Sequence, residues 1–264
     1  MVADTMPENP GEVRKLIRRG ELMRPTCGLV PGYTQANLVA LPAELAFDFF
    51  LFCQRNPRPC PVLEVLEPGK HEPVLTAPGA DIRVDVPLYR VYRDGELVSE
   101  ESDVSAYWNE NLVSFLLGCS FTFETALTRD GISLRHLDEG KNVAMYVTSI
   151  QTTPAGMFAG PLVVSMRPIH LEKVVRAVQI TSRFPAVHGA PLHIGSPEKI
   201  GIGDLSRPDY GDPVEIRDDE VPVFWACGVT PQAVALQSKP SLMITHAPGY
   251  MFITDLRDES LSVL

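Results

Sequence analysis

Prolines interrupt this chain from one end to the other and are the strongest single constraint on its fold. The 24 prolines are scattered between apolar segments and do not form a tract. Because the proline ring fixes φ and removes a backbone donor, each one favours a turn or the end of an element. The chain is therefore expected to fold into many short elements joined by fixed turns, and a proline-rich linker is not expected.

The length of 264 residues suits one large domain. Hydrophobic residues make up 45% and charged residues 21%, which is ordinary globular usage and predicts a sizeable core. No internal repeat and no long linker divides the chain. We predict a single domain over residues 1–264, with two closely packed lobes, about 1–140 and 141–264, as the alternative.

Charge and hydropathy argue against several classes of protein. The net charge is −10, and the only basic group, within residues 14–19, is interpreted as the solvated face of a helix, so a nucleic-acid binder is not expected. The longest apolar run, 112–123, is broken by Ser, Gly and Cys and is too short to span a bilayer. The five cysteines include no Cys-x-x-Cys pair, and the polar first ten residues do not resemble a signal peptide. A cytoplasmic protein without a disulfide framework is expected.

Hydrophobic spacing predicts the elements of the first half. Helical spacing is found in four segments: 11–22, 42–54, 103–118 and 123–128. Alternation predicts strands at 62–66 and 81–93, and Asp94-Gly95 predicts a hairpin turn after the second strand. Residues 25–40 are rich in Gly, Pro, Tyr, Gln and Asn, and we expect a loop that could line a site.

Strands and helices alternate in the second half. Strands are expected at 143–150, 162–166, 191–194, 221–226, 242–245 and 251–254. Helices are expected at 171–183 and 231–237. We therefore predict an α+β fold with a mixed, partly parallel sheet and flanking helices, the C-terminal half being α/β-like.

Residues 118–124, Gly-Cys-Ser-Phe-Thr-Phe-Glu, mix small, polar and aromatic side chains and end in an acid. This composition is typical of a helix end or turn at the wall of a cavity. Burial disfavours the charged form of Glu124, so a raised pKa would make it a general acid or base near neutral pH. The alternative is a core turn in which Glu124 points to solvent.

Two histidines five residues apart, His188 and His193, flank a Gly-Ala-Pro-Leu turn. Histidine titrates near neutral pH, so either could act as an acid or base, or both could simply donate to backbone carbonyls. Together with Asp204 or Asp209 they could also ligate a metal, although the His-Glu-x-x-His motif is missing. No glycine-rich phosphate loop is found, and neither a metal nor a cofactor is predicted.

Further polar residues lie near predicted strand ends. Arg167, expected at the end of a buried strand, could hold a carboxylate through two parallel hydrogen bonds or form a structural ion pair. His246 and Gly249 follow another predicted strand. Cys119 and Cys227 are interpreted either as small buried hydrophobes or as thiols activated by a nearby histidine.

Long and unusual strings run through almost the whole chain. They lie at residues 32–38, 52–57, 118–124, 160–168, 188–195, 208–212, 223–232 and 244–249. With these strings the chain resembles a hydro-lyase family related to D-glutamate cyclase, in one branch of which D-glutamate loses water and closes to 5-oxo-D-proline. The resemblance implies a small lyase that removes water from a carboxylate-bearing metabolite.

The resemblance also implies roles for particular residues. The catalytic residues that it implies are Glu124, His188, His193 and His246. The substrate-binding residues that it implies are Cys119, Ser120, Arg167, Asp209, Tyr210, Thr230 and Gly249. Arg167 would anchor a carboxylate, a histidine or Glu124 would act as the base, and Ser120, His246 or amides near Gly249 would donate hydrogen bonds.

The chain departs from the family pattern at two positions. The family usually has arginine in Met-Tyr-Arg-Thr-Asn and in Pro-Ala-Gly-Arg, where this chain has Val147 and Met157. If either arginine held a substrate carboxylate, this protein binds a different substrate or uses Arg167 or Arg183 instead.

Two other interpretations stay open. One is a non-catalytic protein of the same fold that binds a small acid, and the other is a metal-dependent enzyme that uses the loop from His188 to His193. The expected partner is a small carboxylate substrate, with no nucleic acid and no membrane, and a homodimer is left open.

Overall fold

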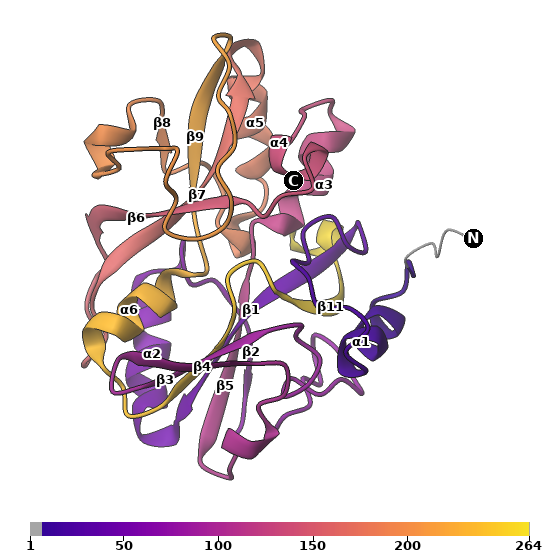
Figure 1. Ribbon diagram of the computed structural model, residues 1–264, viewed down its shortest axis with the longest axis vertical. Coiled ribbons are helices and arrows are strands. Elements are labelled where there is room, and N and C mark those ends of the chain that lie inside the picture. The colour runs from indigo at the N-terminus through magenta and orange to yellow at the C-terminus, as the bar shows by residue number, and fades with distance from the viewer. Residues whose placement is uncertain (1–6, 264) are drawn as a thin grey trace.

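The computed structural model describes residues 7–263, and within them two β-sheets pack with helices around them (Figure 1). The strands of the larger sheet are β1 (Tyr33–Pro42), β2 (Val62–Leu66), β3 (Tyr89–Arg93), β4 (Glu96–Glu101), β5 (Leu112–Gly118), β10 (Met243–His246) and β11 (Phe252–Arg257). The strands of the smaller sheet are β6 (Ala144–Gln151), β7 (Pro161–His170), β8 (His193–Ile194) and β9 (Glu220–Ala226).

The helices are short, as the many prolines predict. The α-helices are α1 (Pro10–Arg18), α2 (Ala43–Arg55), α3 (Phe121–Arg129), α4 (Arg135–Asp138), α5 (Val174–Thr181) and α6 (Thr230–Ser238). The 3₁₀ helices are η1 (Ser105–Tyr107), η2 (Leu171–Lys173), η3 (Pro185–Val187), η4 (Pro197–Ile200) and η5 (Asp258–Leu261). None of the helices within residues 7–263 combines the length and the apolar character that crossing a membrane requires.

The α+β class is confirmed, but the parallel part of the prediction is wrong. Every pair of strands in both sheets is antiparallel. Alternation of strands and helices did not require parallel pairs, because β6 and β7 form a hairpin and the strand that follows α6 leaves the smaller sheet. That strand, β10, pairs with β1 and β3 of the larger sheet.

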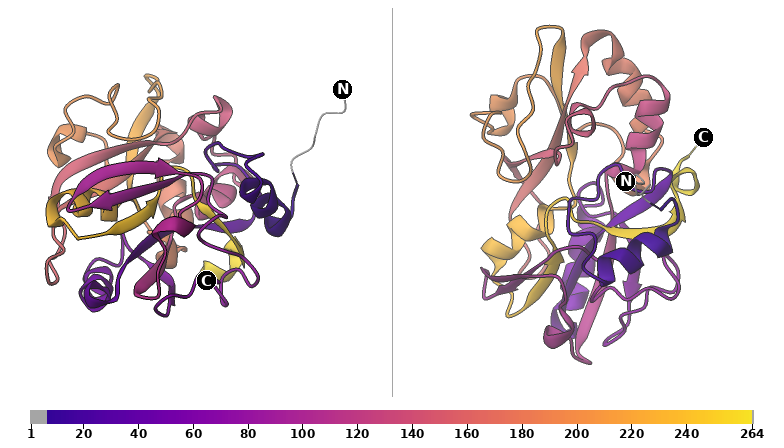
Figure 2. Two further views of the ribbon diagram at one scale, coloured as in Figure 1. Left: turned by 60° about the horizontal axis from the view of Figure 1, so that its bottom comes forward. Right: turned by 45° about the vertical axis from the view of Figure 1, so that its right-hand side comes forward.

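The two sheets draw on different parts of the chain. The smaller sheet uses residues 144–226, whereas the larger sheet uses residues 33–118 and 243–257. In the right view of Figure 2 the pink and orange strands of the smaller sheet lie above the indigo, magenta and yellow strands of the larger one. The single domain, and the alternative of lobes divided near residue 140, stay predictions.

β1 replaces the second half of the loop that we expected over residues 25–40, whereas residues 25–32 are a loop as predicted. It lies at the centre of the larger sheet, between β5 on one side and β10 and β11 on the other. Leu38 and Ala40 are fully buried. A strand that is covered on both faces has no alternation of apolar and polar residues. Without that alternation, the Thr, Gln and Asn residues of β1 suggested a loop.

β5, η1 and the loop between them replace the helix that we expected over residues 103–118. All seven residues of β5 are buried, and a continuous apolar run of this length fits a buried strand as well as a helix. The Oδ1 atom of Asp103 accepts a 2.8 Å hydrogen bond from the Ser105 amide, but only the short η1 follows, and its N-cap is Val104.

The hairpin signal is confirmed. Asp94 and Gly95 connect β3 to β4, and both have positive φ, 49° and 83°, as a tight hairpin turn with two left-handed residues requires. The strand that we expected over 81–93 is shorter than predicted, since β3 begins at Tyr89.

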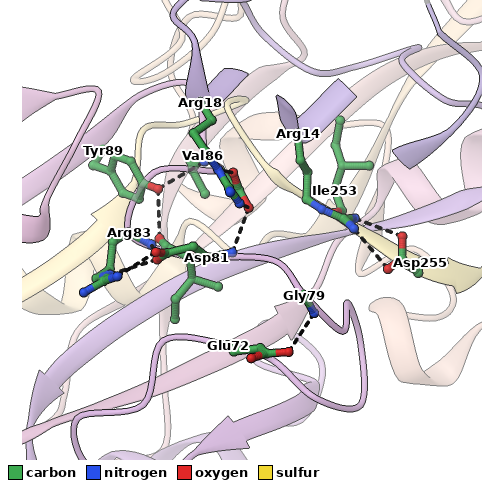
Figure 3. Close-up of polar contacts among 12 residues, drawn as sticks. Arg14, Arg18, Glu72, Gly79, Asp81, Arg83, Val86, Tyr89, Ile253 and Asp255 are labelled. Atoms are coloured by element: carbon green, nitrogen blue, oxygen red, sulfur yellow. Dashed lines mark hydrogen bonds and ion pairs between the residues drawn. The ribbon is translucent and has the colours of Figure 1, made fainter. Parts of the chain in front are cut away.

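The basic residues of α1 are only partly solvated, which corrects the sequence interpretation. Arg14 is 6% exposed and donates two 3.0 Å hydrogen bonds to Asp255 (Figure 3). Arg18 donates to the buried Asp85 at 2.9 and 2.7 Å. The planar guanidinium matches a carboxylate with two bonds, so Arg14 fastens α1 to β11 and Arg18 fastens it to the segment before β3.

Leu38→Ala is expected to lower the free energy of unfolding by about 2–5 kcal/mol, because it opens a cavity in the centre of the sheet. Leu97→Ala is the matched control, since Leu97 is 43% exposed on the edge strand β4; its effect should stay below about 0.5 kcal/mol. Urea unfolding followed by circular dichroism measures both. Equal losses would contradict the central position of β1.

Candidate active site

The junction of β5 and α3 places Glu124 in the interior. β5 ends at Gly118 and α3 begins at Phe121, so Glu124 lies in the first turn of the helix. Gly118 is required at the junction, because a Cβ there would lie 2.5 Å from the Ala186 carbonyl oxygen. Glu124 is 4% exposed, and the alternative of a solvent-facing acid is therefore wrong.

One carboxylate oxygen of Glu124 contacts both Arg167 and His136. Its Oε1 accepts hydrogen bonds from Nε (2.9 Å) and Nη2 of Arg167. The Nε2 atom of His136 lies 3.1 Å from the same oxygen. His136 is 2% exposed and Arg167 is fully buried, so the three charged or ionisable groups form one network away from solvent.

Arg167 is held from all sides. Nη1 donates to Ser165 (3.0 Å) and Nη2 to Ser120 (2.9 Å), and the guanidinium lies 5.5 Å from the ring centres of both Phe123 and Trp225. The prediction that Arg167 ends a strand is wrong, since β7 continues to His170. These contacts engage the guanidinium with Glu124, and a ligand carboxylate would have to displace them.

The pKa of Glu124 is lowered, whereas we expected it to be raised. Burial does raise it, but the nearby His136 and Arg167 and the hydrogen bonds from Arg167 lower it further. Glu124 is therefore a carboxylate at neutral pH and can accept a proton or a hydrogen bond.

His136 is the member of the network that sequence reasoning missed. It lies in α4, a single helical turn between Leu134 and Leu137, where a lone histidine carries no motif. Nothing in the 12-residue separation from Glu124 indicates contact, since it is the tertiary fold that brings the two side chains together. Ser165 was missed for the same reason.

Glu124 lines a pocket of about 200 Å³. The lining residues come from the loop before β1, from β1 itself and from α3 and α4: Gly28, Leu29, Val30, Pro31, Gly32, Tyr33, Gln35, Phe121, Glu124, Thr125, Thr128 and Leu137. Tyr33 and Gln35 thus lie on the wall of a cavity, as the composition of this segment suggested. Val30 has φ of 45°, a strained value for a β-branched residue.

The three histidines that we expected at the site lie away from this pocket. His188 is buried with Nδ1 against the Arg58 carbonyl, and Nδ1 of the buried His246 accepts a 3.2 Å hydrogen bond from the Leu38 amide. Burial lowers the pKa of both to about 4. His193 is partly exposed, with Nε2 2.9 Å from the Ser196 carbonyl oxygen.

Four of the other expected substrate contacts lie near Arg167 or hold parts of the backbone together. Ser120, described above, touches Arg167, and the buried Cys119 has a pKa that is raised by burial. The Thr230 hydroxyl donates a 2.7 Å hydrogen bond to the Cys227 carbonyl and accepts one of 3.1 Å from the Val163 amide, so it connects the start of α6 to β7. The Gly249 carbonyl accepts a 2.9 Å hydrogen bond from the Thr26 amide, which fastens the loop before β1.

Asp209 and Tyr210 line a second, more open cleft of about 350 Å³ together with Arg90, Glu100 and Tyr250. This cleft lies between β3–β4 and the loop after η4. The two positions that lack the family arginines are also away from the Glu124 pocket. Val147 donates its amide to Asp209 (2.8 Å), and Met157 is 39% exposed in the β6–β7 loop.

The metal interpretation finds no supporting cluster. Within residues 7–263 no group of three or more His, Cys, Asp or Glu side chains is arranged to hold a metal ion. His188 and His193 bond to backbone carbonyls, and Asp204 accepts hydrogen bonds from Ser206.

Arg167→Met should lower the free energy of unfolding by about 3–5 kcal/mol, because it leaves the buried Glu124 without the guanidinium that pairs with it. Glu124→Gln combined with Arg167→Met should recover part of that loss, since the buried charge is removed as well. Guanidinium unfolding of the single and double variants measures the coupling. Strictly additive losses would show that the pair is not coupled.

Acid should destabilise the fold through His188 and His246. With a folded pKa of about 4 against 6.5, each histidine binds a proton less readily when folded. The stability that they contribute is complete above pH 6.5 and is lost as pH falls towards 4. Unfolding measured against pH should give a smaller loss for His188→Asn, because asparagine tolerates the positive φ of 86° at this position. His193→Asn is the control, and an equal change in both variants would contradict the assignment.

Comparison with known proteins agrees with the resemblance seen in the sequence. The family model described as D-glutamate cyclase matches residues 113–255. A "Putative hydro-lyase" of Geobacillus kaustophilus is 64% identical over 98% of both chains, and one of Stutzerimonas stutzeri is 60% identical over 97% of both. The "Putative hydro-lyase YcsI" of Bacillus subtilis is 62% identical over 97% of this chain and 99% of its own.

Among solved structures, a nitrogen repressor-like protein from Methanococcus jannaschii covers 94% of this chain and 98% of its own with a TM-score of 0.37 and 8% identity. That similarity is too low to carry a conclusion. The family model spans more than half of this chain, and the curated relatives align over nearly their whole length. The chain therefore belongs to the D-glutamate cyclase family.

Proposed function

We propose that this protein is a hydro-lyase that acts on a small carboxylate or amino acid at the Glu124 pocket. Family membership and the names of the relatives support the reaction class. The observation that carries the choice of site is the buried network of Glu124, Arg167 and His136 at the wall of a small cavity.

A buried network of charged groups contributes little net stability to a fold. Removing two charges from water costs several kcal/mol per ion, and apolar residues of similar volume often stabilise a core equally well. Strongly perturbed ionisable groups beside a cavity are accordingly typical of functional sites. Of the expected site residues, Glu124 meets both conditions, because it is buried in the network and faces the pocket.

We propose D-glutamate as the substrate and 5-oxo-D-proline as the product. In this reaction the amine nitrogen forms a bond to the carbon of the side-chain carboxyl group. A carbon–oxygen bond of that group breaks, and the oxygen leaves as water with two protons from the ammonium. The change is redox-neutral and requires mainly an acceptor for the first proton and an orientation that brings nitrogen and carbon together.

The geometry supports distinct roles for the three residues. Glu124, ionised at neutral pH, is the proton acceptor. Arg167 acts by positioning Glu124 through two hydrogen bonds, in place of the carboxylate anchor that the sequence suggested. His136, with Nε2 3.1 Å from the same oxygen, completes the buried network around the carboxylate.

A non-catalytic protein that binds a small acid is the second candidate. The lowered pKa of Glu124 favours it, because a carboxylate stabilised by Arg167 is a weaker base. The cytoplasmic location and the homodimer stay predictions.

Purified protein should convert D-glutamate to 5-oxoproline, and Glu124→Gln should lower kcat by about 10²–10⁴-fold, the usual contribution of a general base. Glu198→Gln, at an exposed position in η4, is the matched control and should retain the full rate. Chiral chromatography of the product measures both.

Absence of turnover by folded wild-type protein would refute D-glutamate as the substrate. Unchanged turnover by Glu124→Gln would refute the assignment of the site. Binding of D-glutamate without turnover would favour the non-catalytic alternative.

A further inference from the structure

A larger cavity adjoins the Glu124 pocket and carries two arginines. Its volume is about 630 Å³, and it shares five lining residues with that pocket: Gly28, Leu29, Val30, Pro31 and Tyr33. Arg24 and Arg257 lie on its wall, and Glu8 is the one acid that the described part of the chain adds to the lining. Two guanidinium groups outnumber one carboxylate, so this cavity favours an anionic group.

The sheet holds Arg257 at the boundary between the two cavities. Arg257 of β11 is the cross-strand partner of Tyr33 of β1, and its guanidinium lies 3.9 Å from the centre of the Tyr33 ring. A Cβ on Gly32 would lie 3.9 Å from Nη1 of Arg257. Because Tyr33 and Gly32 both line the Glu124 pocket, Arg257 contacts the wall of that pocket from the larger cavity.

Both guanidinium groups are available to a ligand. Arg24 and Arg257 are exposed, and within residues 7–263 neither side chain forms an ion pair or donates a hydrogen bond. The exposed acids beside Arg257 in sequence, Asp255 and Glu259, pair with other arginines. Stacking on an aromatic ring uses the face of a guanidinium and leaves the N–H donors at its edge for a carboxylate.

The arginines and Glu124 are also close enough to act on the same thiol. Burial and then the charge of Glu124 raise the pKa of Cys27 to about 11, whereas the charge of Arg24 lowers it. The two adjoining cavities thus carry free guanidinium groups on one wall and the proposed proton acceptor on the other. A ligand that carries a carboxylate next to an amine matches this arrangement.

We propose that Arg257 and Arg24 bind the carboxylate of a small amino acid whose amine reaches Glu124, which makes both arginines specificity-determining residues. This inference rests on the proposed function for the identity of the substrate and of the proton acceptor. In D-glutamate the bound group is the α-carboxylate, because the side-chain carboxyl group is consumed in the reaction. The edge of a guanidinium offers that carboxylate two parallel N–H donors.

These arginines supply an anchor that the chain lacks elsewhere. Val147 and Met157 stand where the family usually has arginine, and both lie away from the Glu124 pocket. Arg167 is fully buried and engaged with Glu124. The larger cavity is therefore the place where cationic side chains are exposed beside the candidate site.

Binding of three probes to wild-type protein tests the inference without any variant. Titration calorimetry should give D-glutamate about tenfold or more tighter binding than 4-aminobutyrate, which keeps the amine and the side-chain carboxylate but lacks the α-carboxylate. D-Glutamine keeps the α-carboxylate and should bind within a few-fold of D-glutamate. Equal affinities for D-glutamate and 4-aminobutyrate, weak binding of D-glutamine, or binding by none of the three would overturn the inference.

Arg257→Met should weaken binding of D-glutamate about tenfold and leave that of 4-aminobutyrate unchanged. Arg24→Met should act in the same direction, and Arg257→Lys should recover part of the loss because it keeps the charge without the paired donors. Arg207→Met, at another exposed arginine, is the matched control. Circular dichroism checks that each variant is folded, and equal affinities in Arg257→Met, Arg24→Met and Arg207→Met would refute the site.

The two proposals fail separately. Binding of D-glutamate that Arg257→Met weakens, without turnover by wild-type protein, would refute the reaction and keep the carboxylate site. Turnover with an unchanged KM in Arg257→Met and Arg24→Met would keep the reaction and refute the carboxylate site.

Discussion

The pairing of Glu124 with Arg167 is the interaction on which the rest of the site depends. Glu124 is on the helix that continues from β5 of the larger sheet, and Arg167 is in β7 of the smaller one. A buried charge without a partner strongly destabilises the fold. The ion pair therefore holds the two sheets in place relative to each other. Phe123 and Trp225 enclose the guanidinium and restrict it to this arrangement.

The pairing with Arg167 also determines how the Glu124 carboxylate can be used. Oε1 is committed to Arg167 and His136, which keeps the group ionised and fixes its rotation. The same residue lines the pocket of about 200 Å³. The carboxylate of Glu124 therefore makes a structural ion pair and also lines the pocket. In this way a buried carboxylate can be both stabilised and reactive.

Local signals made part of the fold predictable from the sequence. The helix at α2, the hairpin at Asp94 and the strands of the smaller sheet could be located, because periodicity and turn residues report on neighbouring positions. β1 and β5 could not be identified, since strands covered on both faces lose the alternation that marks a strand. In the site, Glu124 could be proposed from its apolar surroundings, but the contact of His136 with Glu124 depends on tertiary packing and leaves no trace in spacing.

The position of β10 has a consequence for how the chain can fold. It lies between β1 and β3, so the β3–β4 hairpin joins the larger sheet only through a strand made more than 140 residues later. Pairings of such long sequence separation are slow to form, because the loop must close before its contacts are gained. During synthesis the first half of the protein therefore exposes an incomplete sheet edge until residues 243–257 emerge, and the last strands complete a core that the first ones began.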